Sequence, residues 1–377
     1  MPAYDAFLLV SFGGPEGPDD VMPFLENVTR GRRVPRERLL EVAEHYMSFG
    51  GKSPINEQCR QLIGALSLPL PVYWGNRNWT PYLGDTVRQM AADGVSRALA
   101  LATSAYRSYS SCRQYLEDIE RARAGVPDAP VIDKIQRFYD HPGFTGPFAE
   151  NVTAALATLP AGLRDEAHLV FTAHSIPVAM AEVAGPGGHR YVAELTEAAS
   201  LISKRLDGLP GGRGGSSPRG QTLADRPWTL VYQSRSGPPS QPWLEPDVTD
   251  HLRELAKSGV RAVVVVPVGF VSDHMEVRHD LDVEAAEVAA SLGLAYARAA
   301  TPGTALAPMV SELVRAHLEG AAPEPCPAGC CLGFKLCTRI FWNWPRARLP
   351  RRAGCSPRGG PRGGPRSRTP SPAPPTW

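Results

Sequence analysis

The stretch that decides the fold is VVVVPVGFVSDHMEVRHDLDVEAAEVAASLG, residues 263–293. It opens with an apolar run that is typical of a strand buried on both faces, then passes through a glycine into a dense group of acidic and histidine side chains. Glu276, Asp280 and Glu284 follow at i, i+4 and i+8, so a helix would place these carboxylates on one face. Stacked like charges cost stability unless a cation or a proton uses them. The stretch therefore predicts a strand that delivers a metal- or proton-handling site to the carboxyl edge of a sheet.

A purely structural explanation of the cluster is also open, in which acidic residues at the start of a solvated helix favour its dipole. It accounts for Asp280, Asp282 and Glu284. It leaves unexplained why His274 and Glu276 stand between the apolar run and the helix. We therefore favour a functional site.

Apolar runs alternate with helical patterns along the chain, which indicates parallel sheets with helices on both faces. The pattern occurs twice, so we expect an α/β fold of two Rossmann-like domains, residues 1–145 and 146–320, with a ligand cleft between them. Residues 208–227 predict a mobile insertion because they are rich in Gly, Ser, Pro and Arg. Residues 321–377 combine a cysteine-containing terminus with a basic Pro/Arg/Gly-rich tail whose composition predicts disorder.

The individual elements follow from the same patterns, with residues 104–115 expected to be a polar loop that leads into a helix ending near residue 123. The expected strands cover residues 5–12, 71–74, 97–102, 131–135, 168–173, 229–233, 262–268 and 296–299. The other expected helices cover residues 20–28, 37–49, 55–66, 80–93, 147–159, 191–206, 247–258, 280–292 and 305–318.

The folded body is acidic, although the whole chain carries a formal net charge of +2. Beyond residue 334 there are ten basic residues and no acidic ones, which leaves 30 basic and 38 acidic residues before that point. An acidic body argues against nucleic acid as a partner. The apolar run at 6–12 lacks a preceding basic segment, and the run at 260–271 is too short to span a bilayer, so we expect a cytoplasmic protein without stable membrane insertion.

A histidine follows a predicted strand in LVFTAHSIP, which places His174 at the carboxyl edge of a sheet, where α/β proteins bind ligands. A lone histidine there would more often be structural. Together with the acidic face around Glu276, it predicts a group that ligates a metal ion or accepts a proton near neutral pH.

Two loop motifs leave their roles open. YQSRSGPPSQPWLEP, residues 232–246, is either a surface connection or a lip that packs on a flat aromatic ligand. GGKSPINEQ, residues 50–58, offers backbone N–H groups, Lys52 and Ser53 to a carboxylate. It lacks the spacing of a Walker loop, and FGGPEG near the N-terminus is not GxGxxG, so we expect no nucleotide.

Cysteines gather at the end of the chain, where five of the seven lie in the last 52 residues. In a cytosolic protein, such a cluster indicates a metal site more than disulfides. Cys59 stands apart in a helical pattern and is expected to be an inert, packed thiol.

Five motifs, taken in order, point to one family. They are LLVSFGGPEGPDDVMPFLENVTRGR, HYMSFGGKSPIN, FTAHSIP, YQSRSGPPSQPWLEP and PVGFVSDHMEV followed by DLD. Together they closely resemble the ferrochelatase family, a group of chelatases of the lyase class, from about residue 4 to residue 318. The resemblance implies two Rossmann-like domains with the porphyrin in the cleft. It also implies insertion of Fe(II) without ATP or a redox cofactor.

The resemblance also assigns the reacting groups. It makes His174 an iron ligand or the acceptor of a pyrrole proton, and it makes Glu276 a base, a ligand or a proton relay. Asp280 and Glu284 match the acidic line that leads outward in the family, on a helix with a wide π-type turn.

The porphyrin-binding residues follow in the same way. Arg30, Tyr46 and Ser53 match positions that hold propionates in coproporphyrin enzymes. Another branch carries a tyrosine near the metal after the first strand, whereas this chain has Phe12, which cannot ligate. A metal-bound tyrosine is therefore excluded at this position, and metal handling must depend on His174 and Glu276.

The YSSC loop and the CPAGCC segment look most like the actinobacterial branch, which inserts Fe(II) into coproporphyrin III to give coproheme in haem biosynthesis. The partners implied are coproporphyrin III, ferrous iron and a downstream haem-pathway enzyme. Two alternatives stay open at this point. One is the same reaction on protoporphyrin IX or with another divalent metal, and the other is a non-catalytic porphyrin or haem carrier with the same fold.

The resemblance further implies a [2Fe–2S] cluster, because actinobacterial and animal members carry one cysteine ligand in the YSSC-type loop and three near the C-terminus. The matching residues are Cys112, Cys326, Cys330 and Cys331. Unliganded thiols or a bound zinc ion are the alternatives, and the adjacent pair at 330–331 constrains the geometry. Cys337 and Cys355 are competing candidates.

Overall fold

The computed structural model describes residues 4–31, 34–208, 226–237 and 240–322, together with residues 326 and 331. Most of the expected insertion at 208–227 and the expected tail beyond residue 331 lie outside the described residues. No helix in the described ranges is both long and apolar enough to cross a lipid bilayer.

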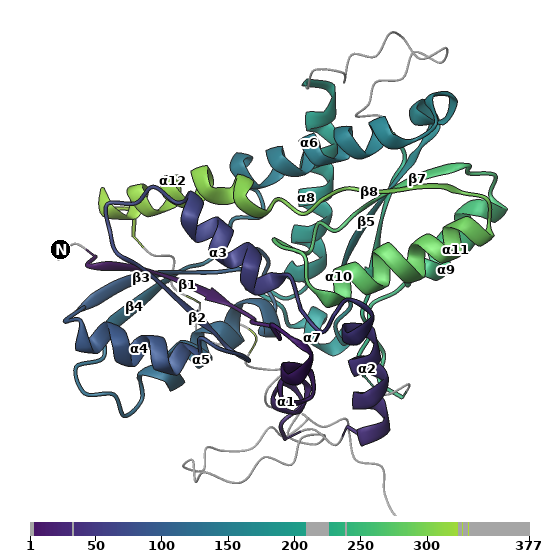
Figure 1. Ribbon diagram of the computed structural model, residues 1–377. Coiled ribbons are helices and arrows are strands. Elements are labelled where there is room, and N and C mark those ends of the chain that lie inside the picture. Colours follow the sequence, from purple (N-terminus) through teal and green to yellow (C-terminus); the bar gives the residue numbers. More distant parts are fainter. Residues whose placement is uncertain are drawn as a thin grey trace, which may run out of the picture. The chain divides into compact units, whose positions relative to one another are not determined.

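Four parallel strands form the first sheet, in the order β2-β1-β3-β4 (Figure 1). They are β1 (Ala6–Ser11), β2 (Val72–Asn76), β3 (Arg97–Ala102) and β4 (Val131–Ile135). Leu9 of β1 pairs with Trp74 on one side and with Leu101 on the other. The expected bounds of β3 and β4 are confirmed.

The second sheet repeats this arrangement, with four parallel strands in the order β6-β5-β7-β8. They are β5 (His168–His174), β6 (Trp228–Gln233), β7 (Ala262–Val266) and β8 (Ala295–Arg298). In each sheet the first strand of the set lies between the second and the third. The predicted α/β class with two parallel sheets is confirmed, while the domain boundary at 145–146 and the ligand cleft stay predictions.

Helices connect the strands, as an all-parallel sheet requires. The α-helices are α1 (Pro18–Val28), α2 (Arg36–Ser48), α3 (Ile55–Ala65), α4 (Leu83–Ala92), α5 (Gln114–Arg123), α6 (Pro142–Thr158), α7 (Val178–Glu182), α8 (Arg190–Arg205), α9 (Val248–Lys257), α10 (Met275–His279), α11 (Ala286–Ser291) and α12 (Ala307–Leu318). Two segments are π turns, η1 (Tyr109–Arg113) and η5 (Asp280–Ala285). Three are 3-10 turns, η2 (Ala161–Glu166), η3 (Leu206–Gly208) and η6 (Gly303–Leu306).

Several helix starts differ from the sequence-based expectation. α6 begins at Pro142 and not at 147, because the His141 ring accepts the N–H of Gly143 at 3.0 Å and proline suits the first helical position. α4 begins at Leu83 and not at 80, because Tyr82 before it is extended.

The π turns are the other difference. The expected polar loop at 104–115 contains η1, and the Ser108 hydroxyl accepts the N–H of Ser111 at its start, at 3.1 Å. The helix expected from residue 280 begins at Met275, and η5 joins α10 to α11 without a break. π turns are rare overall, and those that do occur often lie at functional sites. Both segments are therefore candidates for function.

Each sheet is covered on both faces. Along β1, Phe7 and Leu9 belong to a core that both sheets share, whereas Leu8 and Val10 face a second core under α4 and α5. β7 alternates in the same way between the shared core and a third core under α9 and α11. The shared core also takes in side chains from α3, α6, α8 and α12.

Polar contacts cross between the halves as well. The Tyr106 hydroxyl donates to the carbonyl of Val268 at 2.8 Å. Arg107 binds the fully buried carboxylate of Glu194 on α8, through its guanidinium at 2.7 Å and its backbone N–H at 2.8 Å. These bonds fix the loop after β3 against the second sheet.

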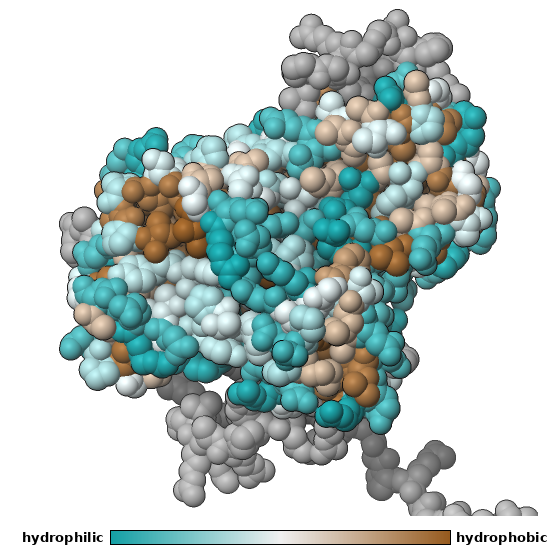
Figure 2. Space-filling view, in the orientation of Figure 1, coloured by the Kyte–Doolittle hydropathy of each residue, from teal (hydrophilic) through white to brown (hydrophobic). Residues whose placement is uncertain are grey.

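Helix α2 exposes some of its apolar side chains and buries others. α2 packs Leu39, Val42 and Tyr46 near α1 but leaves Leu40 and Met47 exposed. The outer side of α2 is accordingly one of the apolar areas in the face shown in Figure 2.

A histidine pair, with His168 buried and His251 partly buried, lies at the other end of the second sheet. His168, at the start of β5, contacts the Thr229 hydroxyl at 3.2 Å, and the same hydroxyl contacts His251 of α9 at 2.7 Å. Burial, together with the nearby charge of His251, lowers the pKa of His168 to about 4.

This depressed pKa makes stability pH-dependent. Above pH 6.5 the folded and unfolded states both hold a neutral His168, but as the pH falls toward 4 the unfolded state binds the proton first. We expect the free energy of unfolding to drop over this range by on the order of 2–3 kcal/mol, and His168→Gln to remove that share of the drop. Urea unfolding at a series of pH values measures it.

His317→Gln, at a partly buried site on α12, controls for the loss of a histidine. An unchanged pH dependence in His168→Gln would show that this pair does not carry the effect.

Candidate active site

Two ionisable side chains from different strand ends meet at one place. His174 is the last residue of β5, and Glu276 lies in α10, which follows β7. The His174 Nε2 and a Glu276 carboxylate oxygen are 3.6 Å apart. The Glu276 side chain is still 47% exposed, so the pair is accessible to a ligand.

The two groups set each other's charge. Burial acts to lower the pKa of His174, but the carboxylate of Glu276 outweighs it and raises this pKa to about 9. Burial acts to raise the pKa of Glu276, but the charge of His174 outweighs it and lowers this pKa to about 2. Near neutral pH His174 and Glu276 therefore form an imidazolium–carboxylate ion pair.

Hydrogen bonds orient the His174 ring. Its Nδ1 donates to the carbonyl of Ser175, so Nε2 is the nitrogen that faces Glu276. The Tyr191 hydroxyl donates to the His174 carbonyl at 2.9 Å and fixes the end of β5. A second histidine, His274, lies 3.8 Å from the same carboxylate, and burial lowers its pKa.

The acidic line leads away from this pair along η5. The ligand atoms of His279, Asp280 and Glu284 all lie within 4.8 Å of one another, an arrangement that could hold a metal ion. Burial, together with the charge of Asp280, raises the pKa of Glu284. A hydrogen bond to Asp280 is the main cause that raises the pKa of His279.

Two residues at the carboxyl end of β6 hold this line in place, Gln233 as the last residue of the strand and Ser234 directly after it. The Gln233 side-chain amide donates to the Glu276 carbonyl at 3.1 Å and to the Asp280 carboxylate at 3.4 Å. The Ser234 hydroxyl donates to the same carboxylate. Ser234 adopts a left-handed backbone with φ of 59°, which directs the chain away from the sheet directly after this contact.

Other acidic residues of the cluster are structural. Asp273 and Asp282 both bind the guanidinium of Arg298, and Asp273 also accepts the Thr301 hydroxyl at 3.0 Å. Arg278 pairs with Asp282 at 2.7 Å. These bonds occupy the two carboxylates, whereas Asp280 and Glu284 have no arginine or lysine partner among the described residues.

An aromatic row joins the first sheet to this site. Phe12, 38% exposed, lies edge-on to Phe24 at 6.4 Å, and Phe24 lies 6.0 Å from Tyr46, measured between ring centres. Burial, together with the charge of Glu276, raises the pKa of Tyr46. The row therefore runs from the end of β1 toward the pair formed by His174 and Glu276.

The other two predicted porphyrin-binding residues differ in exposure. Arg30 is exposed just beyond α1. Ser53 is buried, and its side chain packs on Gly14, where an added Cβ would lie 2.7 Å from it.

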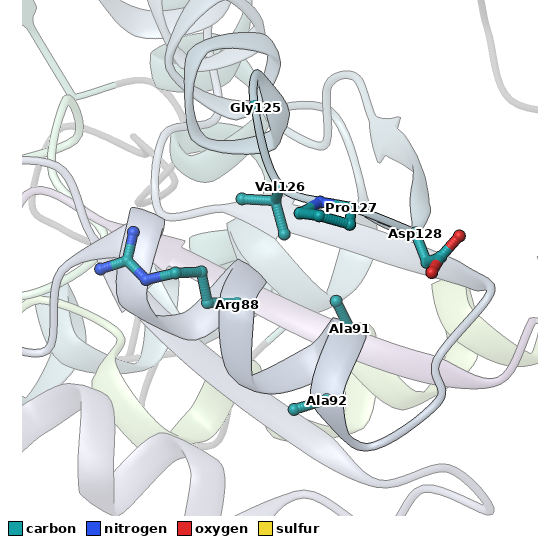
Figure 3. A pocket seen from close by; sticks show the side chains of 7 residues that line it. All are labelled: Arg88, Ala91, Ala92, Gly125, Val126, Pro127 and Asp128. Atoms are coloured by element: carbon teal, nitrogen blue, oxygen red, sulfur yellow. The ribbon is translucent and has the colours of Figure 1, made fainter.

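Hollows on the described surface include two that bear on the site prediction. One of about 310 Å³ lies beside Ser53 and α10, and it is lined by Phe49, Lys52, Pro54, Glu57, Met275 and Arg278. The other, of about 360 Å³, lies between the end of α4 and the loop after α5 (Figure 3). It is lined by Arg88, Ala91, Ala92, Gly125, Val126, Pro127 and Asp128, none of which is a predicted site residue.

Comparison with known proteins assigns the family. A family model described as ferrochelatase matches residues 4–318. The chain is 52% identical over 357 residues to the coproporphyrin III ferrochelatase of Nocardia farcinica, covering 87% of this chain and 97% of that relative. It is 51% identical over 361 residues to that of Streptomyces coelicolor (87% and 93%), and 53% identical over 349 residues to that of Frankia alni (88% and 87%). The chain belongs to the ferrochelatase family.

In this ferrochelatase three of the four predicted cluster cysteines are described. Cys112 is buried in η1, and a hydrogen bond with Cys326, followed by burial, raises its pKa. The buried Cys331 accepts the N–H of Gly185 at 3.4 Å. Cys330, like the competing Cys337 and Cys355, lies outside the described residues.

The cysteine that stands apart from the predicted cluster ligands, Cys59, is packed as expected. Cys59 is buried and donates to the Ser11 hydroxyl at 3.3 Å, and burial raises its pKa to about 11. It is therefore a packed, unreactive thiol.

Sequence reasoning missed several residues that this ferrochelatase places at the site. Gln233 and Ser234 stand within the YQS motif, which was noted only as a loop with an open role. His45 of α2 stacks on His279 with ring centres 3.7 Å apart and planes at 9°. No short-range pattern links residues 45 and 279, so this contact has no sequence signal.

The ion pair yields a direct prediction for the ferrochelatase site. In Glu276→Gln we expect the pKa of His174 to fall from about 9, because the carboxylate that opposes burial most strongly has been removed. A pH titration of ring-nitrogen chemical shifts in ¹⁵N-histidine-labelled protein measures the midpoint.

Glu284→Gln is the matched control, since it removes a carboxylate farther along the same line and should leave the His174 midpoint in place. Equal midpoints in the wild type and Glu276→Gln would disprove the ion pair.

Proposed function

We propose that this chain inserts Fe(II) into coproporphyrin III, giving coproheme and two protons, as a step of haem biosynthesis. The observation that carries the proposal is the accessible His174–Glu276 pair in a member of the ferrochelatase family. The curated relatives named above, all called coproporphyrin III ferrochelatase, support the choice of substrate.

The reaction makes two demands on the protein. A free porphyrin keeps two N–H protons inside its ring, and its nitrogen lone pairs are poorly aimed at an incoming ion until the ring is distorted. Groups beside the ring must then remove water from Fe(II) and take up both protons. An imidazole and a carboxylate facing one space provide both functions.

The protonation state of the pair decides the order of events. Before substrate binds, His174 is already protonated beside the Glu276 carboxylate, so its Nε2 cannot accept another proton. We propose that the entering porphyrin and metal separate the pair. His174 then loses its proton toward the acidic line and becomes a base, while the Glu276 carboxylate is released to face the ring.

The acidic line supplies the exit and entry route in this proposal. Asp280 and Glu284 follow Glu276 outward, and His279 lies between them. Carboxylates and imidazoles bind hydrated divalent ions and also transfer protons, so one line serves hydrated Fe(II) moving inward and protons moving outward.

Coproporphyrin III carries four propionates, so its recognition demands cations near the ring. The segment RGRRVPRER, residues 30–38, places five arginines within nine positions of an otherwise acidic body. We propose that Arg30, Tyr46 and Ser53 hold propionates, with Phe12 against the ring. Arginine suits this role because its planar group binds carboxylates through paired hydrogen bonds.

The substrate prediction is tested by anaerobic Fe(II) insertion followed by absorbance. We expect faster turnover of coproporphyrin III than of protoporphyrin IX, because protoporphyrin IX has two fewer carboxylates. Faster turnover of protoporphyrin IX would contradict the substrate.

His174→Ala should lose insertion by on the order of a hundredfold or more, as expected for a lost acid–base group, while it still binds the porphyrin. A wild-type protein that binds porphyrin without any insertion would instead be a carrier.

We also propose that Cys112, Cys326, Cys330 and Cys331 hold a [2Fe–2S] cluster. The described residues fit such a group: the thiols of Cys112 and Cys326 are hydrogen-bonded to each other, and Cys331 receives a backbone N–H, the kind of donor that cluster sulfurs accept. When bound, the cluster ties the terminal segment to the loop after β3.

Cluster assembly is tested by iron and acid-labile sulfide analysis of anaerobically purified protein. We expect two of each per chain in the wild type and in Cys59→Ser, and loss of both in Cys112→Ser, because thiolates are the cluster ligands. A wild-type protein that holds zinc, or no metal, would refute the cluster. The expected cytoplasmic location and the downstream enzyme partner stay predictions.

A further inference from the structure

A buried lysine beside these cysteines has no carboxylate partner among the described residues. Lys134 on β4 is 3% exposed. Its ammonium donates to the carbonyls of Ile135 at 3.1 Å and Gln136 at 3.4 Å. Within the described residues no carboxylate lies at ion-pair distance from it. Burying an ammonium group without an opposite charge costs several kcal/mol, so such lysines are rare unless something negative compensates.

The neighbouring carboxylate does not provide that charge. Asp133 precedes Lys134, but successive side chains of a strand point to opposite faces. Asp133 also binds the guanidinium of Arg97 at 2.6 Å and the Tyr4 hydroxyl at 3.2 Å. The nearby Arg107 adds a further positive charge.

Besides the two backbone carbonyls, the thiols of Cys112 and Cys326 lie near the ammonium. Burial lowers the pKa of Lys134. Cys112 and Cys326, when ionised as thiolates, raise it again through their negative charge. Cys112 also lies 3.5 Å from the side-chain carbonyl of Gln136, two residues along from Lys134. Arg113, next to Cys112 in η1, is hydrogen-bonded to Cys326, so a second cation faces the same sulfurs.

We infer that Lys134 is the charge partner of an anionic metal–thiolate centre bound through Cys112 and Cys326, and that it sets how readily this centre is held and reduced. The inference rests on the proposed [2Fe–2S] cluster. Four thiolates and two sulfides outweigh two ferric ions, so the centre is negative, and reduction by one electron makes it more so. A fixed positive charge in a low-dielectric site stabilises the reduced form more than the oxidised form.

The test compares Lys134→Met, which keeps the length and removes the charge, with Lys134→Arg, which keeps the charge. Lys257→Met, at an exposed lysine paired with Glu254, is the matched control. Iron and sulfide content, the reduction potential from a dye-mediated titration, and the half-life of the cluster in a chelator are measured on full-length protein. We expect Lys134→Met to shift the potential to a more negative value and to shorten the half-life several-fold. Lys134→Arg and Lys257→Met should stay near the wild type.

A second background separates charge from packing. In Cys112→Ser, which cannot complete the centre, Lys134→Met should raise the unfolding temperature, because an uncompensated buried charge has been removed. A merely structural lysine would lower it in both backgrounds.

The outcomes are distinct. A wild type with a cluster, together with an unchanged potential and half-life in Lys134→Met, overturns the inference and leaves the cluster standing. A wild type without iron and sulfide overturns both.

Discussion

The covering of both sheet faces is the constraint on which the rest of the structure depends. Every residue of β7 is buried, and its side chains alternate between the shared core and the core under α9 and α11. A polar group inside such a strand would lack partners, so polar chemistry is displaced to the carboxyl ends. β5 and β7 are adjacent and parallel, with Phe171 opposite Val266. The ionisable groups at their carboxyl ends, His174 as the last residue of β5 and those of the segment at 273–276 after β7, therefore meet by geometry alone.

The pKa values of three neighbouring ionisable groups shift in different directions at this site. His174 and His274 both lie close to the carboxylate of Glu276. Glu276 is ionised and His174 is protonated because each stabilises the other's charge. His274, close to the same carboxylate, has a lowered pKa because burial prevails there. Such divergence of neighbouring groups is how one site provides an acid, a base and a neutral donor at a single pH. In the proposed reaction, the proton-accepting state would arise only once the ion pair is broken, which would couple the base to the presence of substrate.

The sequence predicted what repeats locally and missed what depends on distant contacts. Strand periodicity located β3 and β4, and the apolar-to-polar transition singled out His174 and Glu276. The family resemblance implied a π turn at the acidic line, but the second one, at Tyr109–Arg113, looked like a loop, because a π turn has no period of its own. Gln233 and the burial of Lys134 were invisible, since an amide or an ammonium reveals its role only through its partners.

The negative charge of the acidic line depends on which of its carboxylates are paired with an arginine. Arg298 neutralises Asp273 and Asp282, so the negative charge that remains on this surface sits on Asp280 and Glu284. The cation beside these two is a histidine, which can release its proton. His279 stacks on His45, and two stacked imidazoles cannot both be protonated at low cost. Burial and the charge of His279 lower the pKa of His45, whereas Asp280 raises that of His279, so a proton taken up by the stacked pair favours the member nearest the carboxylates. A divalent ion arriving at the line would displace that proton, because the ion and the imidazolium compete for the same carboxylate oxygens.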